Sequence, residues 1–298
     1  MADRGPHRSP EATGIMTNDD APRIEYVEAR RVLLDALDAL RAHLDAVVLV
    51  SAQAVYLRTA GRIEGYQPFT TDADIVLDPT LLGDIPPLRE AMERGGFVLT
   101  DEPGIWEARF MRPGFADEVV VPVDLIVPEE LAPKAGRRAA RLPGPHGKTT
   151  ARKSPGLAGA VVDNGPVDLV SLEGGDPRTT TVNVAGYGAL LVAKLHKLGD
   201  RLATPQRLQA KDAGDVYRLF DAVAPDEMTA ILRSLLADER STATTEKALT
   251  YLDELFISPA AVGVGLAVEA LRAVLPADTV AAAISGYTAE LRRSVGRT

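Results

Sequence analysis

Apolar residues recur at helical spacing near the start of the chain and then change to a continuous run. Between residues 23 and 44 they fall three or four positions apart, which predicts a helix. Residues 47–50 form a short apolar run, typical of a buried strand. A short helix is expected from Ala52, and a second strand after Thr71. The first part of the chain therefore predicts a helix, a strand, a helix and a strand in succession.

The mixture of strands and helices continues to residue 184, and from residue 186 the pattern changes. Further strands are expected at residues 97–100, 105–111, 119–127, 167–172 and 179–184, with a helix at 86–94. From residue 186 to residue 293 only helical segments follow, and Thr204-Pro205 and Pro225 mark two helix starts. The pattern predicts an α+β fold, in which a mixed sheet with flanking helices is followed by a C-terminal helical region.

The same change of pattern divides the chain into three parts. Residues 1–22 are rich in Pro, Gly and charged residues without periodicity, which predicts a disordered tail. Residues 23–184 would form the sheet-containing domain, and residues 185–298 a helical domain that completes the active site.

Two carboxylates precede and enter the strand expected after Thr71. Asp72 and Asp74 are separated by one residue, so on a strand they point to the same face. Carboxylates that close repel each other unless a proton or a cation lies between them. Mg²⁺ prefers such oxygen ligands. The pair therefore indicates a metal site, and a solvated pair at a strand end is the alternative.

A third carboxylate, Asp124, lies within the apolar run of residues 119–127. Burying a charge there is costly unless the charge is paired or binds a metal. If this strand lies beside the strand of Asp72 and Asp74, the three carboxylates would hold one or two Mg²⁺ ions and a nucleoside triphosphate. Asp124 would also be the base for the acceptor hydroxyl. Its alternative role is to cap a backbone group.

Two later predicted helices carry opposite charges, a basic face on the first and an acidic pair on the second. Lys194, Lys197 and Arg201 share one helical face, and Asp212 lies with Asp215 on the next helix. Lys194 is expected to hold triphosphate oxygens, assisted by Lys197, while Asp212 supports Lys194. An ordinary salt bridge between the two helices is the alternative.

Composition adds one local feature. The chain has a net charge of −9, yet residues 131–162 contain no acidic residue. Such a stretch favours a polyanionic partner such as RNA, whereas a solvated surface loop is the alternative. The predicted acceptor-binding residues are Arg137, Arg138, Arg141, Lys148 and Arg152, and Lys134 and Lys153 lie in the same stretch.

The composition also argues against cysteine-based sites and against a location in a membrane. The chain has no cysteine, so neither disulfides nor thiolate metal sites are expected. The first twenty residues are polar, and no run of eighteen apolar residues occurs. A cytoplasmic protein without membrane contact is therefore expected.

Four segments together resemble a known superfamily: VSAQAVYL, FTTDADIVLDP, VDLIVPEEL and AKLHKLGDR…KDAGDVYRL. They resemble the nucleotidyltransferases related to DNA polymerase β over residues 47–219. Within that superfamily the chain is most similar to the AbiEii/MenT-like toxins of bacterial abortive-infection and toxin–antitoxin systems.

The resemblance implies a nucleotidyltransferase fold and assigns roles to individual residues. Asp72, Asp74 and Asp124 match the metal ligands, and Lys194 and Asp212 match the later motif. Ser51 and Ala52 stand where the family holds phosphates with a small residue pair. Such toxins use NTP and Mg²⁺ to modify an acceptor, which is the 3′ end of tRNA for MenT-like members, and a cognate antitoxin is a possible partner.

Two other functions stay open at this point. A transferase acting on a small molecule, as aminoglycoside-modifying relatives do, would share the same metal and triphosphate residues. A degenerate fold that only binds a nucleotide is the other alternative, because Ser51-Ala52 lacks the glycine of the family's pair.

Overall fold

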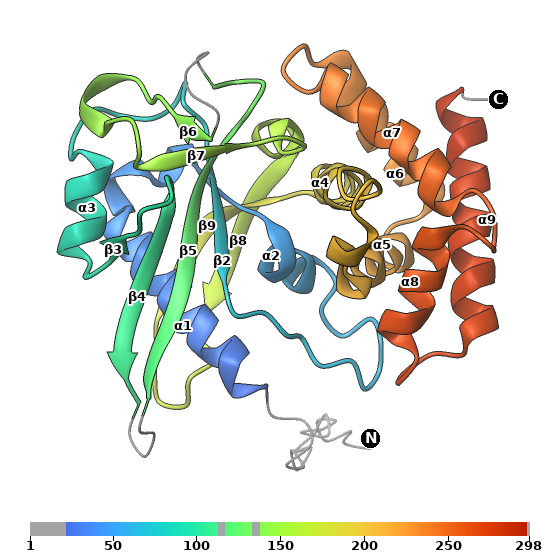
Figure 1. Ribbon diagram of the computed structural model, residues 1–298, viewed down its shortest axis with the longest axis horizontal. Helices are drawn as coiled ribbons and strands as arrows, with labels where there is room; N and C mark the ends of the chain where they lie inside the picture. Colours follow the sequence, from blue (N-terminus) through green and yellow to red (C-terminus); the bar gives the residue numbers. More distant parts are fainter. Residues whose placement is uncertain (1–21, 113–116, 133–137, 297–298) are drawn as a thin grey trace, which may run out of the picture.

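The computed structural model describes residues 22–112, 117–132 and 138–296, and it contains a mixed sheet with a group of helices on one side (Figure 1). The described α-helices are α1 (Ile24–Ala39), α2 (Ser51–Arg58), α3 (Leu88–Arg94), α4 (Tyr187–Gly199), α5 (Ala210–Ala222), α6 (Pro225–Ala237), α7 (Thr242–Phe256), α8 (Val262–Leu271) and α9 (Ala277–Val295). The described strands are β1 (Val47–Leu49), β2 (Ala73–Leu77), β3 (Val98–Leu99), β4 (Ile105–Met111), β5 (Glu118–Pro128), β6 (Ala139–Ala140), β7 (Ala151–Ser154), β8 (Asn164–Val170) and β9 (Thr179–Ala185). Short 3₁₀ turns are η1 (Arg41–Ala46), η2 (Gly144–His146), η3 (Ala158–Val161) and η4 (Pro205–Arg207). The predicted α+β class, with a mixed sheet, flanking helices and a C-terminal helical region, is confirmed.

The order of the strands brings the predicted carboxylates together. The main path of the sheet is β3-β4-β5-β2-β1-β9-β8. β1 is antiparallel to β2, and β2 is parallel to β5. In that parallel pair Asp74 lies opposite Asp124, so both side chains leave the same face of the sheet on strands about 4.8 Å apart. The predicted adjacency of these two strands is confirmed.

Two short strands lie in the acid-free stretch, where the sequence pattern indicated only a loop. β6 pairs with β7, and β7 joins β5 in parallel with Arg152 opposite Ile126. Gly104 makes this junction possible, because it has a φ of +74° and donates its amide hydrogen to the carbonyl of Thr149. A Cβ atom at Gly104 would lie 2.3 Å from the backbone nitrogen of Arg152. Only glycine allows this close approach of three backbone segments.

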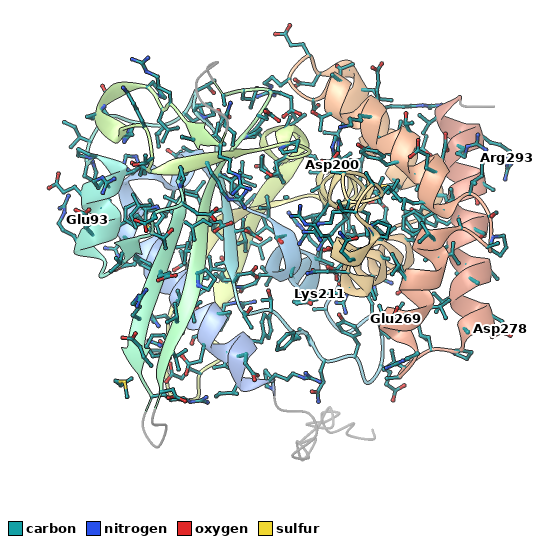
Figure 2. All side chains as sticks on the ribbon, viewed as in Figure 1. Glu93, Asp200, Lys211, Glu269, Asp278 and Arg293 are labelled. Atoms are coloured by element: carbon teal, nitrogen blue, oxygen red, sulfur yellow. The ribbon has the colours of Figure 1, made fainter. Side chains whose placement is uncertain are left out.

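One hydrophobic core connects the sheet to the helical region. It includes Ile75 and Leu125 from the sheet and Leu191 and Leu195 from α4. α4 contacts α2, α5 and α7, and side chains fill the space between these helices (Figure 2). These contacts fix the position of α4 relative to the sheet.

A buried arginine ties α5 to α2 beside the same core. Arg218 of α5 donates hydrogen bonds to Thr59 Oγ1 at 2.5 and 3.0 Å. Its guanidinium carbon lies 5.1 Å from the ring centre of Tyr56 and 4.1 Å from that of Tyr66. Stacking on both rings stabilises the charge that burial would otherwise penalise.

Three expectations about the elements differ from the structure or lie outside it. The helix expected to residue 44 ends at Ala39 and continues as the 3₁₀ turn η1. Thr204-Pro205 starts only the single turn η4, and α5 begins at Ala210. Of the predicted tail, residues 1–21 lie outside the described residues. The division into domains at residue 184 stays a prediction. Among the described helices, none has the length and apolar character needed to cross a bilayer.

Candidate active-site cleft

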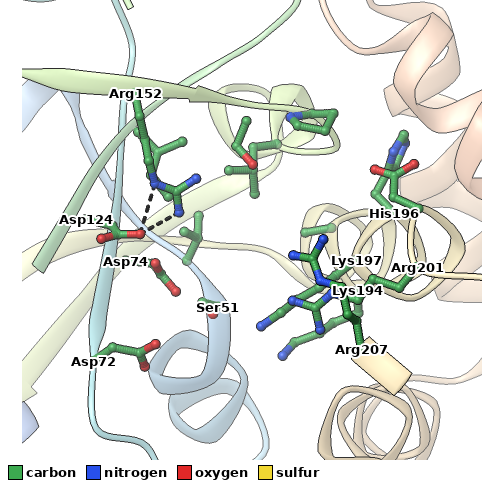
Figure 3. A pocket seen from close by; sticks show the side chains of 17 residues that line it. Ser51, Asp72, Asp74, Asp124, Arg152, Lys194, His196, Lys197, Arg201 and Arg207 are labelled. Carbon is green, nitrogen blue, oxygen red and sulfur yellow. Dashed lines mark hydrogen bonds and ion pairs between the residues drawn. The ribbon is translucent and has the colours of Figure 1, made fainter. Parts of the chain in front are cut away.

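A cleft of about 440 Å³ lies between the sheet and α4. Its volume is within the range of sites that bind small ligands. Two sets of charged side chains face each other across it (Figure 3). The sheet side contributes Ser51, Asp72, Asp74, Asp124 and Arg152, and the helical side contributes Lys194, Lys197, Arg201 and Arg207. Most residues that the sequence marked as catalytic are therefore brought to one place.

The acidic wall is built at the start of β2. Asp72 directly precedes the strand, and its Oδ1 accepts a hydrogen bond of 2.5 Å from Thr70 Oγ1. Gln53 of α2 donates its side-chain amide to the backbone carbonyl of Asp72 at 3.1 Å. Neither Thr70 nor Gln53 was among the site residues predicted from the sequence. A hydroxyl two residues before a carboxylate is a local pattern that the sequence could have revealed, whereas the Gln53 contact depends on tertiary structure.

Charge repulsion is concentrated on Asp74. Burial, followed by the neighbouring carboxylates of Asp72 and Asp124, raises the pKa of Asp74 to about 6, although a hydrogen bond from Ser51 opposes the shift. Groups that are destabilised in this manner gain most from a bound cation. A cation bound at the acidic wall would therefore reduce the repulsion between these carboxylates.

The side chains of this wall fit a metal only in part. Within the described parts of the chain, no three or more Asp, Glu, His or Cys side chains are arranged as a metal site. Asp72 and Asp74 offer carboxylate oxygens of the kind that hard divalent cations bind. The carboxylate of Asp124, predicted as the third ligand, is held by Arg152 instead. Two of the three predicted ligands thus fit a divalent cation as they stand.

Arg152 does not lie on an outer surface loop as its assignment to RNA binding assumed. It belongs to β7, and its Nε and Nη2 donate hydrogen bonds of 3.0 and 2.5 Å to Asp124 Oδ2. Burial raises the pKa of Asp124, and Arg152 opposes that shift. The sequence could not reveal this pair, because β7 was not recognised as a strand beside β5.

Ser51 adopts a strained backbone conformation at the edge of the cleft. Its φ is +64°, and among the described residues no other residue except glycine has a positive φ. It begins α2, whose first turn has no side-chain cap. Ala52, the second residue of the predicted phosphate-binding pair, is buried beside Tyr26 and Tyr56. The backbone thus takes a glycine-like conformation although the residue is serine, at a cost of about 1–2 kcal/mol.

Two substitutions of Ser51 separate this strain from the role of the hydroxyl. Ser51→Gly and Ser51→Ala both remove the hydroxyl, but only glycine adopts a positive φ without strain. We expect the glycine variant to be about 1 kcal/mol more stable than the alanine variant in urea unfolding. Equal stability of the two variants would contradict the strain, and an equal decrease of NTP affinity in both would assign that decrease to the hydroxyl.

The basic wall comes from the end of α4 and from η4. The side chains of Lys197 and Arg201 are 39% and 21% exposed, and both form ion pairs with Asp212 at 3.3 and 3.4 Å. Arg207 is exposed and lines the same cleft. Arg201 lines the cleft with Lys194 and Lys197 as predicted, but it lies in the turn after α4, which ends at Gly199, and not on the helix. Arg207 was missed, because its position depends on the short turn η4.

Lys194 is more deeply buried than its predicted role requires. Its side chain is 3% exposed, and Nζ lies 2.9 Å from Asp212 and 2.6 Å from Asp215. Burial would lower the pKa of Lys194, but Asp215 and Asp212 outweigh it and raise the pKa. The predicted contact between Lys194 and Asp212 is present. Two carboxylates already neutralise this ammonium group, so Lys197 and Arg201 are better placed to receive phosphates.

The other predicted acceptor-binding residues lie away from the cleft or outside the described residues. Arg138 is exposed and pairs with Glu102 at 3.0 Å. Arg141 and Lys148 are also exposed. Lys134 and Arg137 lie outside the described residues. Of the described basic residues in the acid-free stretch, Arg152 is the one that lines the cleft.

Comparisons with known proteins identify no family for the chain. No protein-family model matches the sequence, and no curated protein matches it. Among solved structures, the chain is similar to an antigenic nucleotidyltransferase-like protein from Paracoccidioides brasiliensis. The identity is 15%, the alignment covers 76% of this chain and 94% of that chain, and the TM-score is 0.41. Similarity at this level does not establish a shared activity.

Proposed function

We propose that the protein is a nucleotidyltransferase that transfers a nucleotide from NTP to an acceptor hydroxyl in the presence of Mg²⁺. The opposite charges of the two cleft walls carry this proposal (Figure 3). A triphosphate needs positive charge along its whole length. A divalent cation on Asp72 and Asp74 would supply it from one side, and Lys197, Arg201 and Arg207 would supply it from the other.

The chain contributes further groups to triphosphate binding. Asp72 and Asp74 would hold one or two Mg²⁺ ions, and bound Mg²⁺ neutralises charge on the phosphate oxygens. The first amides of α2 have no side-chain cap, so they are available to phosphate oxygens. The Ser51 hydroxyl, which donates to Asp74 in the free protein, would have to rotate away from Asp74 to reach them. Lys194 would keep α4 and α5 together rather than touch the nucleotide.

The transfer itself requires one new bond and one broken bond. The acceptor oxygen attacks the α-phosphorus of NTP, and the bond from that phosphorus to the β-phosphate oxygen breaks, so that pyrophosphate leaves. The hydroxyl proton passes to the carboxylate of Asp124. Burial raises the pKa of Asp124, and a more basic carboxylate is a better proton acceptor.

For the acceptor we propose RNA, specifically the 3′ end of tRNA, which would make the protein a toxin with a cognate antitoxin. Arg138, Arg141 and Lys148 support an RNA acceptor, because they are exposed in an acid-free stretch of a protein with a net charge of −9. A phosphate backbone is the polyanion that such residues bind.

Incubation of labelled NTP with total RNA tests this function directly. We expect label in small RNA with the wild-type protein and Mg²⁺, and none with Asp72→Asn or without a divalent cation. Label in a small molecule instead would identify the aminoglycoside-type alternative. No consumption of any NTP would leave a nucleotide-binding fold without activity.

Neutralising the exposed basic residues should weaken RNA binding selectively. The triple variant of Arg138, Arg141 and Lys148 to alanine is expected to lower the log–log salt dependence of RNA binding by about 0.7–0.9 for each RNA phosphate that the protein no longer neutralises. NTP binding should change little. A matched triple variant to alanine at Arg233, Arg272 and Arg293 removes the same amount of charge from a different region. These three exposed residues belong to the C-terminal helices, and Figure 2 shows Arg293 on α9. Equal effects of the two triple variants would contradict a local RNA site.

A further inference from the structure

Arg152 and Asp124 form an ion pair inside the proposed active site. The guanidinium group donates two hydrogen bonds to one oxygen, Asp124 Oδ2 (Figure 3). The same carboxylate is the proposed base, and it lies opposite Asp74 in the sheet. In the free protein Arg152 therefore engages the carboxylate that the proposed reaction needs as its base.

The pair is accessible, although its backbone is fixed. The side chains of Arg152 and Asp124 are 28% and 17% exposed, and both line the cleft. The backbone of Arg152 is anchored by the pairing of β7 with β5 and by Gly104. Any exchange of partners must therefore come from rotation of the long Arg152 side chain and not from movement of the strand.

Two groups expected in the loaded cleft compete for the members of this pair. A divalent cation on Asp72 and Asp74 attracts the Asp124 carboxylate and repels the guanidinium group. A phosphate group accepts paired hydrogen bonds from arginine as well as a carboxylate does. A phosphate that enters beside β7 would thus replace one charge-assisted pair by another and leave Asp124 free.

We infer that Arg152 is a positioning residue that releases Asp124 when it binds an acceptor phosphate next to the reacting hydroxyl. This inference rests on the proposed function and narrows its acceptor class. The preferred acceptor has a phosphate close to the hydroxyl, as the 3′ end of an RNA has. An acceptor without that phosphate leaves Asp124 paired to Arg152.

Binding of Mn²⁺ to the free protein tests the first half of this inference without any turnover. Arg152→Gln should bind Mn²⁺ about tenfold more tightly than wild type, because it frees a carboxylate from a charge-assisted pair. In an Asp124→Asn background the same substitution should have little effect. Arg272→Gln removes an exposed arginine outside the cleft lining and should leave the Mn²⁺ affinity unchanged. Equal Mn²⁺ affinity of Arg152→Gln and wild type, or an equal gain in both backgrounds, would overturn the inference.

Two acceptors that differ in one phosphate test the second half. With labelled NTP, Arg152→Gln should raise the KM for the dinucleotide CpA by about tenfold and leave that for adenosine nearly unchanged. Arg152→Lys, which keeps the charge, should restore part of the affinity for CpA. An equal fall in kcat with both acceptors would assign Arg152 a purely structural role and overturn the inference. If wild type labels neither acceptor, the proposed transfer to RNA fails, whereas the Mn²⁺ measurements still decide whether Arg152 restrains Asp124.

Discussion

Asp74→Asn is expected to abolish NTP transfer and yet to stabilise the metal-free protein. Asp74 has a pKa of about 6 in the fold, well above the ordinary value of 3.8. The folded state favours the protonated form of Asp74. The free energy of unfolding is therefore highest below about pH 4, where the group is protonated, and it falls as the pH rises through 6 and Asp74 ionises in the fold. At pH 7.5 the asparagine variant should be about 3 kcal/mol more stable than wild type in urea unfolding with a chelator present. At pH 4 the difference should nearly vanish.

Adding Mg²⁺ should reverse this order of stability, because only the wild type would gain from binding the ion. Asp176→Asn is the matched control. Arg178 lowers the pKa of Asp176, so this substitution should not raise stability at pH 7.5, and transfer should remain. An Asp74→Asn variant that transfers NTP normally would remove the acidic wall from the mechanism.

Lys194 and Lys197, one helical turn apart, are expected to give opposite results. Lys194→Met leaves the buried carboxylates of Asp212 and Asp215 without their closest partner. Breaking such a buried pair typically costs about 3–5 kcal/mol, which should appear as a large fall in the free energy of unfolding. Lys197→Met should change stability by less than about 1 kcal/mol, since its side chain is partly exposed.

Affinity for NTP should follow the reverse order in folded protein. Lys197→Met is expected to weaken NTP binding about ten- to a hundredfold, as measured by titration with a nonhydrolysable analogue. This ranking differs from the one that motif alignment predicts, in which Lys194 holds the phosphates. A stable Lys194→Met variant with the larger decrease in affinity would restore the original assignment.

The acidic wall was predictable because its geometry is local. The spacing of Asp72 and Asp74, together with the apolar run around Asp124, follows directly from the alternation of side chains on strands. Only the pairing of β2 with β5 had to be assumed, and the register of Asp74 and Asp124 confirms it. The class of fold was predictable for the same reason.

The partners of the basic residues were not predictable. Helical spacing places Lys194, Lys197 and Arg201 on one face, but it does not say which of them is buried against α5. Arg152 looked like part of a surface loop, because β7 is only four residues long and lies among Pro and Gly residues. In both cases a tertiary contact between charges decides the environment, and no local pattern encodes it.

Gly104 shows how a residue without a side chain can govern the chemistry of others. Its backbone lies against the backbone of Arg152 so closely that a single methyl group would not fit. The separation of β5 and β7, and with it the reach of the guanidinium group, depends on this contact. A substitution at Gly104 would lengthen that reach without altering any charge in the cleft. Variants selected for altered acceptor preference could therefore carry their change at this uncharged position, outside the cleft lining.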